Sequence, residues 1–398
     1  MRKGIFQLYA HSMSGSIVLV LLVFILSACN TPGQGTNQTA STNDNNSSSN
    51  PTTTIQTGPQ SCPAAVSSTT YWDPIVPTQT DINHVAQVTC AHLLGNSSIQ
   101  ALITVQATGP GAPLDVYVYD HITTPNPNRI FLLQDLYKGE AKISGYDTLM
   151  TGEVNQNSLA NKNQSSNNMT VDLYREFQWS PDANTLVPVA FPGFFPDMTR
   201  YQAENDQQQV NQGHEPWKLS ATSVAHAFAT DTTFLSWPPD TRTTVISGGG
   251  KSDTNAVIAV KNSGPGNRVI DVKMSRLEGK TNGIWIVTGA SSPNFAINTP
   301  ANNDRINSPI TVKGTGIAFE GHIGKLMVLD SHYNQIGQSN VPGTNGNGTS
   351  SFSTKLSFNS TFKNGLEEGL IELYGYSNAD GSIANAAMSK VMLMYSGS

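Results

Sequence analysis

Apolar and polar residues alternate through much of the chain, and this pattern predicts a protein built mainly of β-strands. Segments with a period of two, bounded by turn-forming residues, are typical of strands in antiparallel sheets. In the first part of the chain that we expect to fold, they cover residues 98–106, 114–120, 130–133 and 173–179. We expect Pro188, Pro192 and Pro196 to end regular structure there. The pattern predicts a small antiparallel β domain over residues 61–198.

A helical period replaces the alternation in the next segment, residues 199–290. Residues 201–211 are polar and compatible with a helix, and Ser220 can cap a second helix. The apolar residues of that second helix share one face: Ala221, Val224, Ala225 and Phe228. Four strands follow, at residues 243–247, 256–261, 268–277 and 283–288. A helix followed by a sheet that ends in a G-x-W-x-V strand resembles the cone-shaped fold of the nuclear-transport-factor-like superfamily. We therefore expect an α+β cone-like domain, with Trp285 in its core or sheet.

About seven short strands in roughly 100 residues predict an immunoglobulin-like β-sandwich over residues 294–398. Three motifs stand in this segment: S-P-I-x-V-x-G at 308–314, A-F-E at 318–320 and Y-S-x-A-D-G-S at 376–382. They resemble the Gmad-type immunoglobulin-like domain, which occurs in bacterial spore-germination lipoproteins and in other exported proteins. The resemblance implies the sandwich fold and a spore or envelope setting, and it motivates the hypothesis of a role in sporulation or spore germination. The sporulation domain that often accompanies this family is not evident here.

The N-terminus has the pattern of an export signal. Arg2 and Lys3 precede an apolar run at residues 17–26, too short to span a bilayer stably, and Leu-Ser-Ala-Cys ends at Cys29. This order resembles the lipobox of bacterial lipoproteins, in which the cysteine is acylated and becomes the new N-terminus. We expect residues 1–28 to be a signal peptide and Cys29 to be the lipid anchor on the extracytoplasmic face of a membrane. The alternative is an ordinary signal peptide followed by an incidental cysteine.

Residues 29–60 are rich in Asn, Thr, Ser, Gln and Gly, and we expect a disordered tether after the anchor. The next segment, with its cysteine, its β-strands and the run Arg-Glu-Phe-Gln-Trp at 175–179, resembles the LppP/LprE family of lipoproteins. That resemblance implies no known chemistry. Charged residues make up 13% of the chain and the net charge is −6, without a basic block. Nucleic-acid binding needs clustered Lys and Arg, so we exclude it.

Three cysteines are present, and lipidation of Cys29 leaves Cys62 and Cys90 as a pair. An exported protein meets an oxidising environment, so we expect a disulfide that closes a loop of about 28 residues. Two buried free thiols are the alternative. A metal site is less favoured, because zinc usually takes four ligands and His84 and His92 are the nearby histidines.

Several short motifs resemble functional sites but have simpler explanations. Residues 248–252 read Gly-Gly-Gly-Lys-Ser, but the phosphate-binding loop needs a glycine where Val245 stands, so we expect a turn. His214-Glu215 runs into Pro216, which excludes a zincin helix. Asp380-Gly381 has the chemistry of a turn. Four tyrosines on strands could form a glycan-stacking surface, although cross-strand packing is the commoner role: Tyr117, Tyr119, Tyr374 and Tyr376.

We predict a non-enzymatic, membrane-anchored lipoprotein of the bacterial cell envelope with a binding or scaffolding role. We expect no catalytic residue, cofactor or metal, and an envelope protein or a cell-wall glycan as partner. The alternatives are an enzyme or small-ligand carrier with its pocket in the cone-like domain, and a structural spacer.

Overall fold

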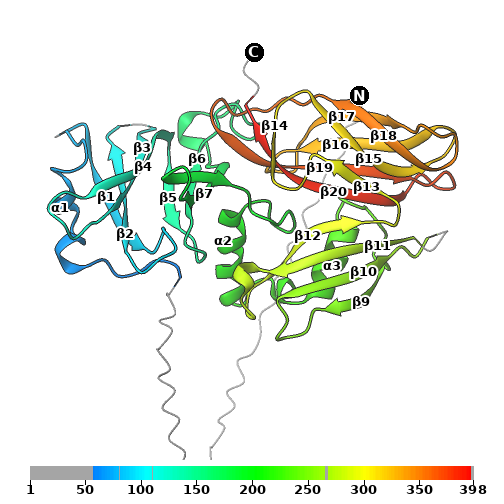
Figure 1. The fold of residues 1–398 in the computed structure, drawn as a ribbon, viewed down its shortest axis with the longest axis horizontal. Coiled ribbons are helices and arrows are strands. Elements are labelled where there is room, and N and C mark those ends of the chain that lie inside the picture. The colour runs from blue at the N-terminus through cyan, green and yellow to red at the C-terminus, as the bar shows by residue number, and fades with distance from the viewer. Residues whose placement is uncertain (1–56, 80, 110, 265–267, 396–398) are drawn as a thin grey trace, which may run out of the picture. The chain divides into compact units, whose positions relative to one another are not determined.

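Antiparallel β-sheets are the main regular structure of the folded chain, which confirms the predicted mainly-β architecture (Figure 1). The computed structural model describes residues 57–79, 81–109, 111–264 and 268–395. The predicted signal peptide, Cys29 and almost all of the predicted tether lie outside the described residues. Among the described residues, no helix is long and apolar enough to cross a membrane.

The first region consists of two four-stranded antiparallel sheets, each with its strands in sequence order. The first sheet contains β1 (Asn83–Ala91), β2 (Gln100–Ala107), β3 (Pro113–Asp120) and β4 (Asn128–Tyr137). The second contains β5 (Glu140–Ile143), β6 (Leu149–Glu153), β7 (Leu173–Ser180) and β8 (Thr185–Val189). Short helical turns flank them: η1 (Ala64–Val66), α1 (Thr69–Trp72) and η2 (Ser166–Asn168).

The four predicted strands of this region correspond to β2, β3, β4 and β7, and the sequence analysis missed the other four. The expectation that Pro188 ends regular structure is wrong, because Pro188 lies inside β8 opposite Phe177. β8 is the edge strand of its sheet, so a residue without an N–H is tolerated there.

A disulfide joins Cys62 to Cys90, as predicted from the cysteine count. Cys90 is buried in the apolar core of the first sheet, together with Trp72 and Tyr117. Gln60, which the sequence analysis assigned to the tether, pairs with Cys90 through a backbone hydrogen bond of 2.7 Å. Gly58 donates its N–H to the Asp147 carboxylate at 2.7 Å. The ordered structure therefore includes the last residues of the predicted tether.

The middle region has two helices followed by four antiparallel strands, in the predicted order. The helices are α2 (Arg200–Asn211) and α3 (Ala221–Thr230), separated by the turn η3 (Pro216–Leu219). Ser220 caps α3 by accepting a hydrogen bond from the N–H of Ser223, and the predicted apolar face is buried. The strands are β9 (Arg242–Gly248), β10 (Asn255–Lys261), β11 (Val269–Arg276) and β12 (Trp285–Ser291), with the turn η4 (Leu277–Gly279) before β12. Trp285 is fully buried in the core, as expected.

The C-terminal region is an immunoglobulin-like sandwich. One sheet has the order β13-β15-β18, and the facing strands have the order β17-β16-β19-β20, with β14 parallel to β20. The strands are β13 (Ala296–Thr299), β14 (Asp304–Ile306), β15 (Ile310–Ala318), β16 (His322–Leu329), β17 (Gln335–Pro342), β18 (Gly348–Leu356), β19 (Leu366–Tyr376) and β20 (Ile383–Met394). The predicted turn at residues 379–382 joins β19 to β20.

One sheet passes from the sandwich into the middle region, because β20 pairs with β12 at Ser291 and Ala387 (Figure 1). A single apolar cluster also spans both regions and contains Phe228 of α3 together with Leu370 and Tyr374 of β19. All described residues belong to one compact unit. The strands β19 and β20 are therefore covered on both faces.

We predict that the disulfide stabilises the first region substantially. The double variant Cys62→Ala/Cys90→Ala should lower the free energy of unfolding by about 3–4 kcal/mol, because the unfolded chain regains the freedom of a loop of 28 residues. Urea unfolding of the wild type and the variant measures this difference. Wild type treated with a reductant is the control and should approach the variant. Equal unfolding midpoints in all three samples would contradict the prediction.

Candidate functional site

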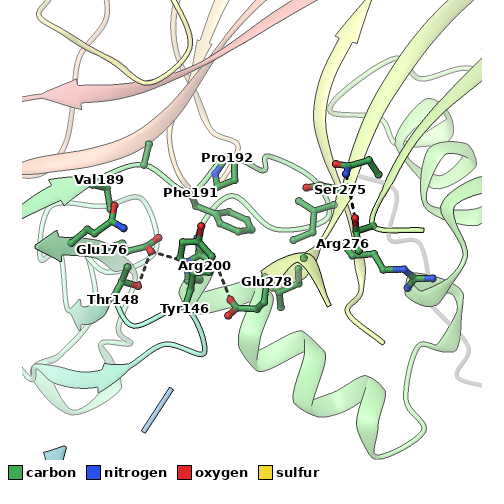
Figure 2. A pocket seen from close by; sticks show the side chains of 17 residues that line it. Tyr146, Thr148, Glu176, Val189, Phe191, Pro192, Arg200, Ser275, Arg276 and Glu278 are labelled. Atoms are coloured by element: carbon green, nitrogen blue, oxygen red, sulfur yellow. Dashed lines mark hydrogen bonds and ion pairs between the residues drawn. The ribbon is translucent and has the colours of Figure 1, made fainter. Parts of the chain in front are cut away.

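A cavity of about 390 Å³ lies where the first region meets the middle region (Figure 2). Its wall includes residues from β7, from the segment after β8, from the first turn of α2 and from the end of β11 with η4. Figure 2 shows the Arg200 side chain between the carboxylates of Glu176 and Glu278. The cavity is one candidate for a functional site, and the bonds that its charged groups already make determine what it could bind.

Arg200 holds two carboxylates from different regions. Its Nε donates to Glu176 at 2.7 Å and its Nη1 donates to Glu278 at 2.8 Å. The three side chains are 8%, 4% and 6% exposed, respectively. The Thr148 hydroxyl also donates to Glu176, at 2.7 Å. These bonds pair the guanidinium with one oxygen of each carboxylate, whereas Glu176 Oε2 and Glu278 Oε2 are buried without a hydrogen-bond partner among the described residues.

The position of Arg200 explains why it needs two carboxylates. Thr199 begins α2 with a capping box completed by Gln202, which places Arg200 in the first helical turn. A cation is disfavoured there, because the helix dipole is positive at its N-terminus. Glu176 and Glu278 offset that cost and connect β7 and η4 to α2.

The second guanidinium on the cavity wall is also bonded to protein groups. Arg276 donates to the backbone carbonyls of Asp253, Gly283 and Gly250, and it lies over the Trp285 ring at 4.4 Å from the centroid. Burial lowers the pKa of Arg276. The ionic groups of this cavity therefore bind other parts of the protein, and their geometry is that of a structural junction.

A second buried ionic group links the sandwich to the segment between β8 and α2. Lys390 of β20 pairs with Glu368 of β19 at 2.8 Å, and each side chain is 2% exposed. The Lys390 ammonium group also donates to the carbonyls of Gly193, at 2.9 Å, and Met198. Burial raises the pKa of Glu368 to about 7, against the opposing effect of Lys390.

Two more glutamates of β19 are buried. Burial raises the pKa of Glu372 to about 8, and the Tyr374 hydroxyl donates to its carboxyl group at 2.9 Å. Glu367 has a pKa of about 7 for the same main reason, with Asp330 contributing, and it accepts a hydrogen bond from the Ser331 hydroxyl at 2.7 Å. The sequence analysis missed these acids, although a carboxylate inside an otherwise apolar strand is a signal of this kind of site.

A groove of about 410 Å³ lies at one end of the sandwich, where two turns meet. The first turn joins β15 of one sheet to β16 of the facing sheet through Glu320 and Gly321, which both have positive φ, and Phe319 and His322 exchange backbone hydrogen bonds across it. The second is the turn of the β19–β20 hairpin. The groove therefore contains residues of two motifs noted in the sequence, at 318–320 and 376–382.

Arg268, the residue before β11, fixes the second hairpin turn. It pairs with Asp380 at 3.1 Å and donates to the hydroxyls of Ser377 and Ser382. Hydrogen bonds from Ser377 and Arg268 hold the pKa of the Asp380 carboxyl well below its usual range. Gly324 lies on the opposite side, with φ of +154°, and a Cβ there would meet the Tyr374 carbonyl at 1.8 Å. One side of the groove is thus fixed by the Arg268 side chain and the other by the backbone at Gly324.

The structure places the other residues singled out in the sequence as follows. Gly248 and Gly249 have positive φ, and the N–H of Gly250 bonds to Asp253, so this segment forms the expected turn. In the described part of the chain, no three metal-ligating side chains come together. Of the four tyrosines, Tyr117, Tyr119 and Tyr374 are buried, whereas Tyr376 is 44% exposed at the groove.

The C-terminal region thus has the architecture of an immunoglobulin-like domain, with a groove between its β15–β16 turn and its β19–β20 hairpin. Residues 294–382 match the family model Gmad2, described as the immunoglobulin-like domain of bacterial spore germination. This match confirms the Gmad-type domain predicted from the three motifs. A sequence comparison with curated proteins found no match. The resemblance of the N-terminal part to lipoproteins stays a prediction.

We predict that Arg200→Met lowers the free energy of unfolding by about 3–5 kcal/mol, because it leaves Glu176 and Glu278 buried without a cation. Urea unfolding provides the measurement. Arg242→Met, at an exposed position on β9, is the matched control and should change stability by less than about 0.5 kcal/mol. Adding Glu176→Gln and Glu278→Gln to Arg200→Met should restore part of the loss. Equal effects of the two arginine substitutions would rule out a structural ion network.

We predict that stability falls as pH rises from about 5 to 8. The folded pKa of Glu372, about 8, lies above its ordinary value of 4.5, so its contribution is complete below 4.5 and is lost as pH rises through 8. Between these two pKa values, the titration of Glu372 lowers the free energy of unfolding by about 1.4 kcal/mol per pH unit. Glu372→Gln should reduce the slope between pH 6 and 8, measured by urea unfolding at several pH values. A slope identical to that of the wild type would show that Glu372 does not titrate in this range.

Proposed function

We propose that this protein is a membrane-anchored, non-enzymatic lipoprotein of the bacterial cell envelope that binds or scaffolds an envelope partner in sporulation or spore germination. The observation that carries the proposal is the match of residues 294–382 to the immunoglobulin-like domain of bacterial spore germination. The N-terminal sequence supports the anchor: Leu-Ser-Ala-Cys after an apolar run makes Cys29 the acylated residue. The disulfide supports folding outside the cytoplasm.

The buried charges support a binding rather than a catalytic role. The charged groups described at the 390 Å³ cavity and on β19 bond to other protein groups, and Arg200 and the Lys390–Glu368 pair link the regions. Enzymes commonly place titratable groups with shifted pKa values within reach of a substrate. Here Glu368 and Glu372 are fully buried within the fold. We therefore assign the binding role to the exposed surface of the sandwich, with an envelope protein or a cell-wall glycan as partner.

We predict that the wild-type protein is enriched in spore membranes of its host and that Cys29→Ala moves it to the culture medium. Acylation supplies the hydrocarbon that holds the chain to the bilayer, and the substitution removes its attachment point. Immunoblots of purified spores, vegetative membranes and medium measure this distribution. Membrane retention of the variant would exclude the anchor at Cys29.

A deletion strain tests the role in spores separately. Spores that lack the protein should lose optical density more slowly on germination, and the wild-type gene should restore the rate. Normal spore formation and normal germination in the deletion strain would refute the spore role while leaving the anchor intact.

A further inference from the structure

We propose that the groove between the β15–β16 turn and the β19–β20 hairpin binds a neutral oligosaccharide. This inference rests on the proposed function, because it assigns a ligand class and a site to the binding role named above. Three properties of the groove support saccharide binding: exposed apolar side chains, unused hydrogen-bonding groups and the absence of an unpaired permanent charge among its lining residues.

The groove exposes apolar side chains that a folded protein usually buries. Phe319, Tyr376 and Ile317 are 51%, 44% and 42% exposed, respectively, and all three line it. Clustered exposure of this kind marks an interaction site. The electron-rich face of an aromatic ring attracts the polarised C–H groups of a sugar ring, which stacks on it with little need for a charged partner.

Polar groups with unused bonding capacity lie next to these rings. Asn378 and Asn385 line the groove, and within the described part of the chain their side-chain amides make no hydrogen bond. A carboxamide has both donors and an acceptor, as a sugar hydroxyl does. The exposed His322 adds a further polar edge. A few polar groups beside an apolar surface are the usual composition of a small-molecule site.

Charge selects the kind of ligand. Arg268 is the permanently charged residue on the groove wall, and it is paired with Asp380 and bonded to Ser377 and Ser382. The whole chain carries a net charge of −6. A phosphate or another anion would have to compete with Asp380 for Arg268, whereas a neutral saccharide would not. The charges therefore favour a neutral ligand over an anionic polymer.

The size and rigidity of the groove fit the same ligand. Its volume of about 410 Å³ lies within the usual range for small-ligand sites. Arg268 fixes the turn that presents Tyr376 and Asn378, and the tight turn at Glu320 and Gly321 fixes Phe319. A site that is already ordered loses less conformational entropy when it binds a ligand.

We predict that the full chain, carrying Cys29→Ala to keep it unacylated, binds chitotetraose or cellotetraose in isothermal titration calorimetry. Phe319→Ala and Tyr376→Ala should each weaken binding about 3- to 10-fold, because each removes one aromatic surface. The double variant should lose at least tenfold. Tyr395→Ala is the matched control, since Tyr395 is 42% exposed but is not a lining residue of the groove, and its affinity should equal that of the parent.

Three results would overturn the proposal. The first is no heat of binding with either tetrasaccharide at millimolar concentration. The second is binding that the double variant retains, since the ligand would then occupy another site. The third is a concentration-dependent dimer, detected by analytical ultracentrifugation, that Phe319→Ala dissociates, since the groove would then bind a second copy of the chain. The titration uses purified protein, so failure of saccharide binding and failure of spore localisation are separate outcomes.

Discussion

The burial of β19 and β20 on both faces is the constraint on which the rest of the structure depends. One face of β19 packs in the sandwich core through Ile371 and Leu373, and the other joins the cluster of the middle region through Leu370 and Tyr374. Any charged side chain on these strands must therefore find its partner inside the protein. Lys390 does so with Glu368 and two backbone carbonyls, which fixes the segment between β8 and α2 against the sandwich.

Buried arginines also connect the first region to the other two. Arg175 of β7 donates to the carbonyls of Leu366 and Asn364 and pairs with Glu153. Through Arg200, α2 is bonded to both β7 and η4. Removal of one partner from any of these groups leaves a buried charge behind, which costs more than the intact pair contributes. The ionic groups therefore specify how the regions meet more than they add to stability.

The features predicted from sequence are those with local causes. The helix α3 was found from the Ser220 cap and the spacing of its apolar residues, which all lie within one segment. The β19–β20 turn was found from its Asp-Gly sequence. The burial of Glu372 has a different origin, because it arises from contacts with strands and helices far along the chain. Likewise, the motifs at 318–320 and 376–382 could be named in advance, but their meeting at one groove depends on the long-range pairing of β16 with β19.

The bonding state of the side chains separates the two candidate sites. At the 390 Å³ cavity, Arg200 and Arg276 already bond to protein acceptors, so less of their bonding capacity is left for a ligand. At the groove, the rings of Phe319 and Tyr376 are about half exposed, and the neighbouring Asn378 and Asn385 amides make no hydrogen bond to the described residues. The groove also depends on more than the sandwich, because Arg268 belongs to the connection before β11 in the middle region. An isolated sandwich would have the same aromatic rings but would lack the bonds from Arg268 that order the Tyr376–Ser382 turn. The middle region thus supplies Arg268, which lines the groove and orders the turn beside it.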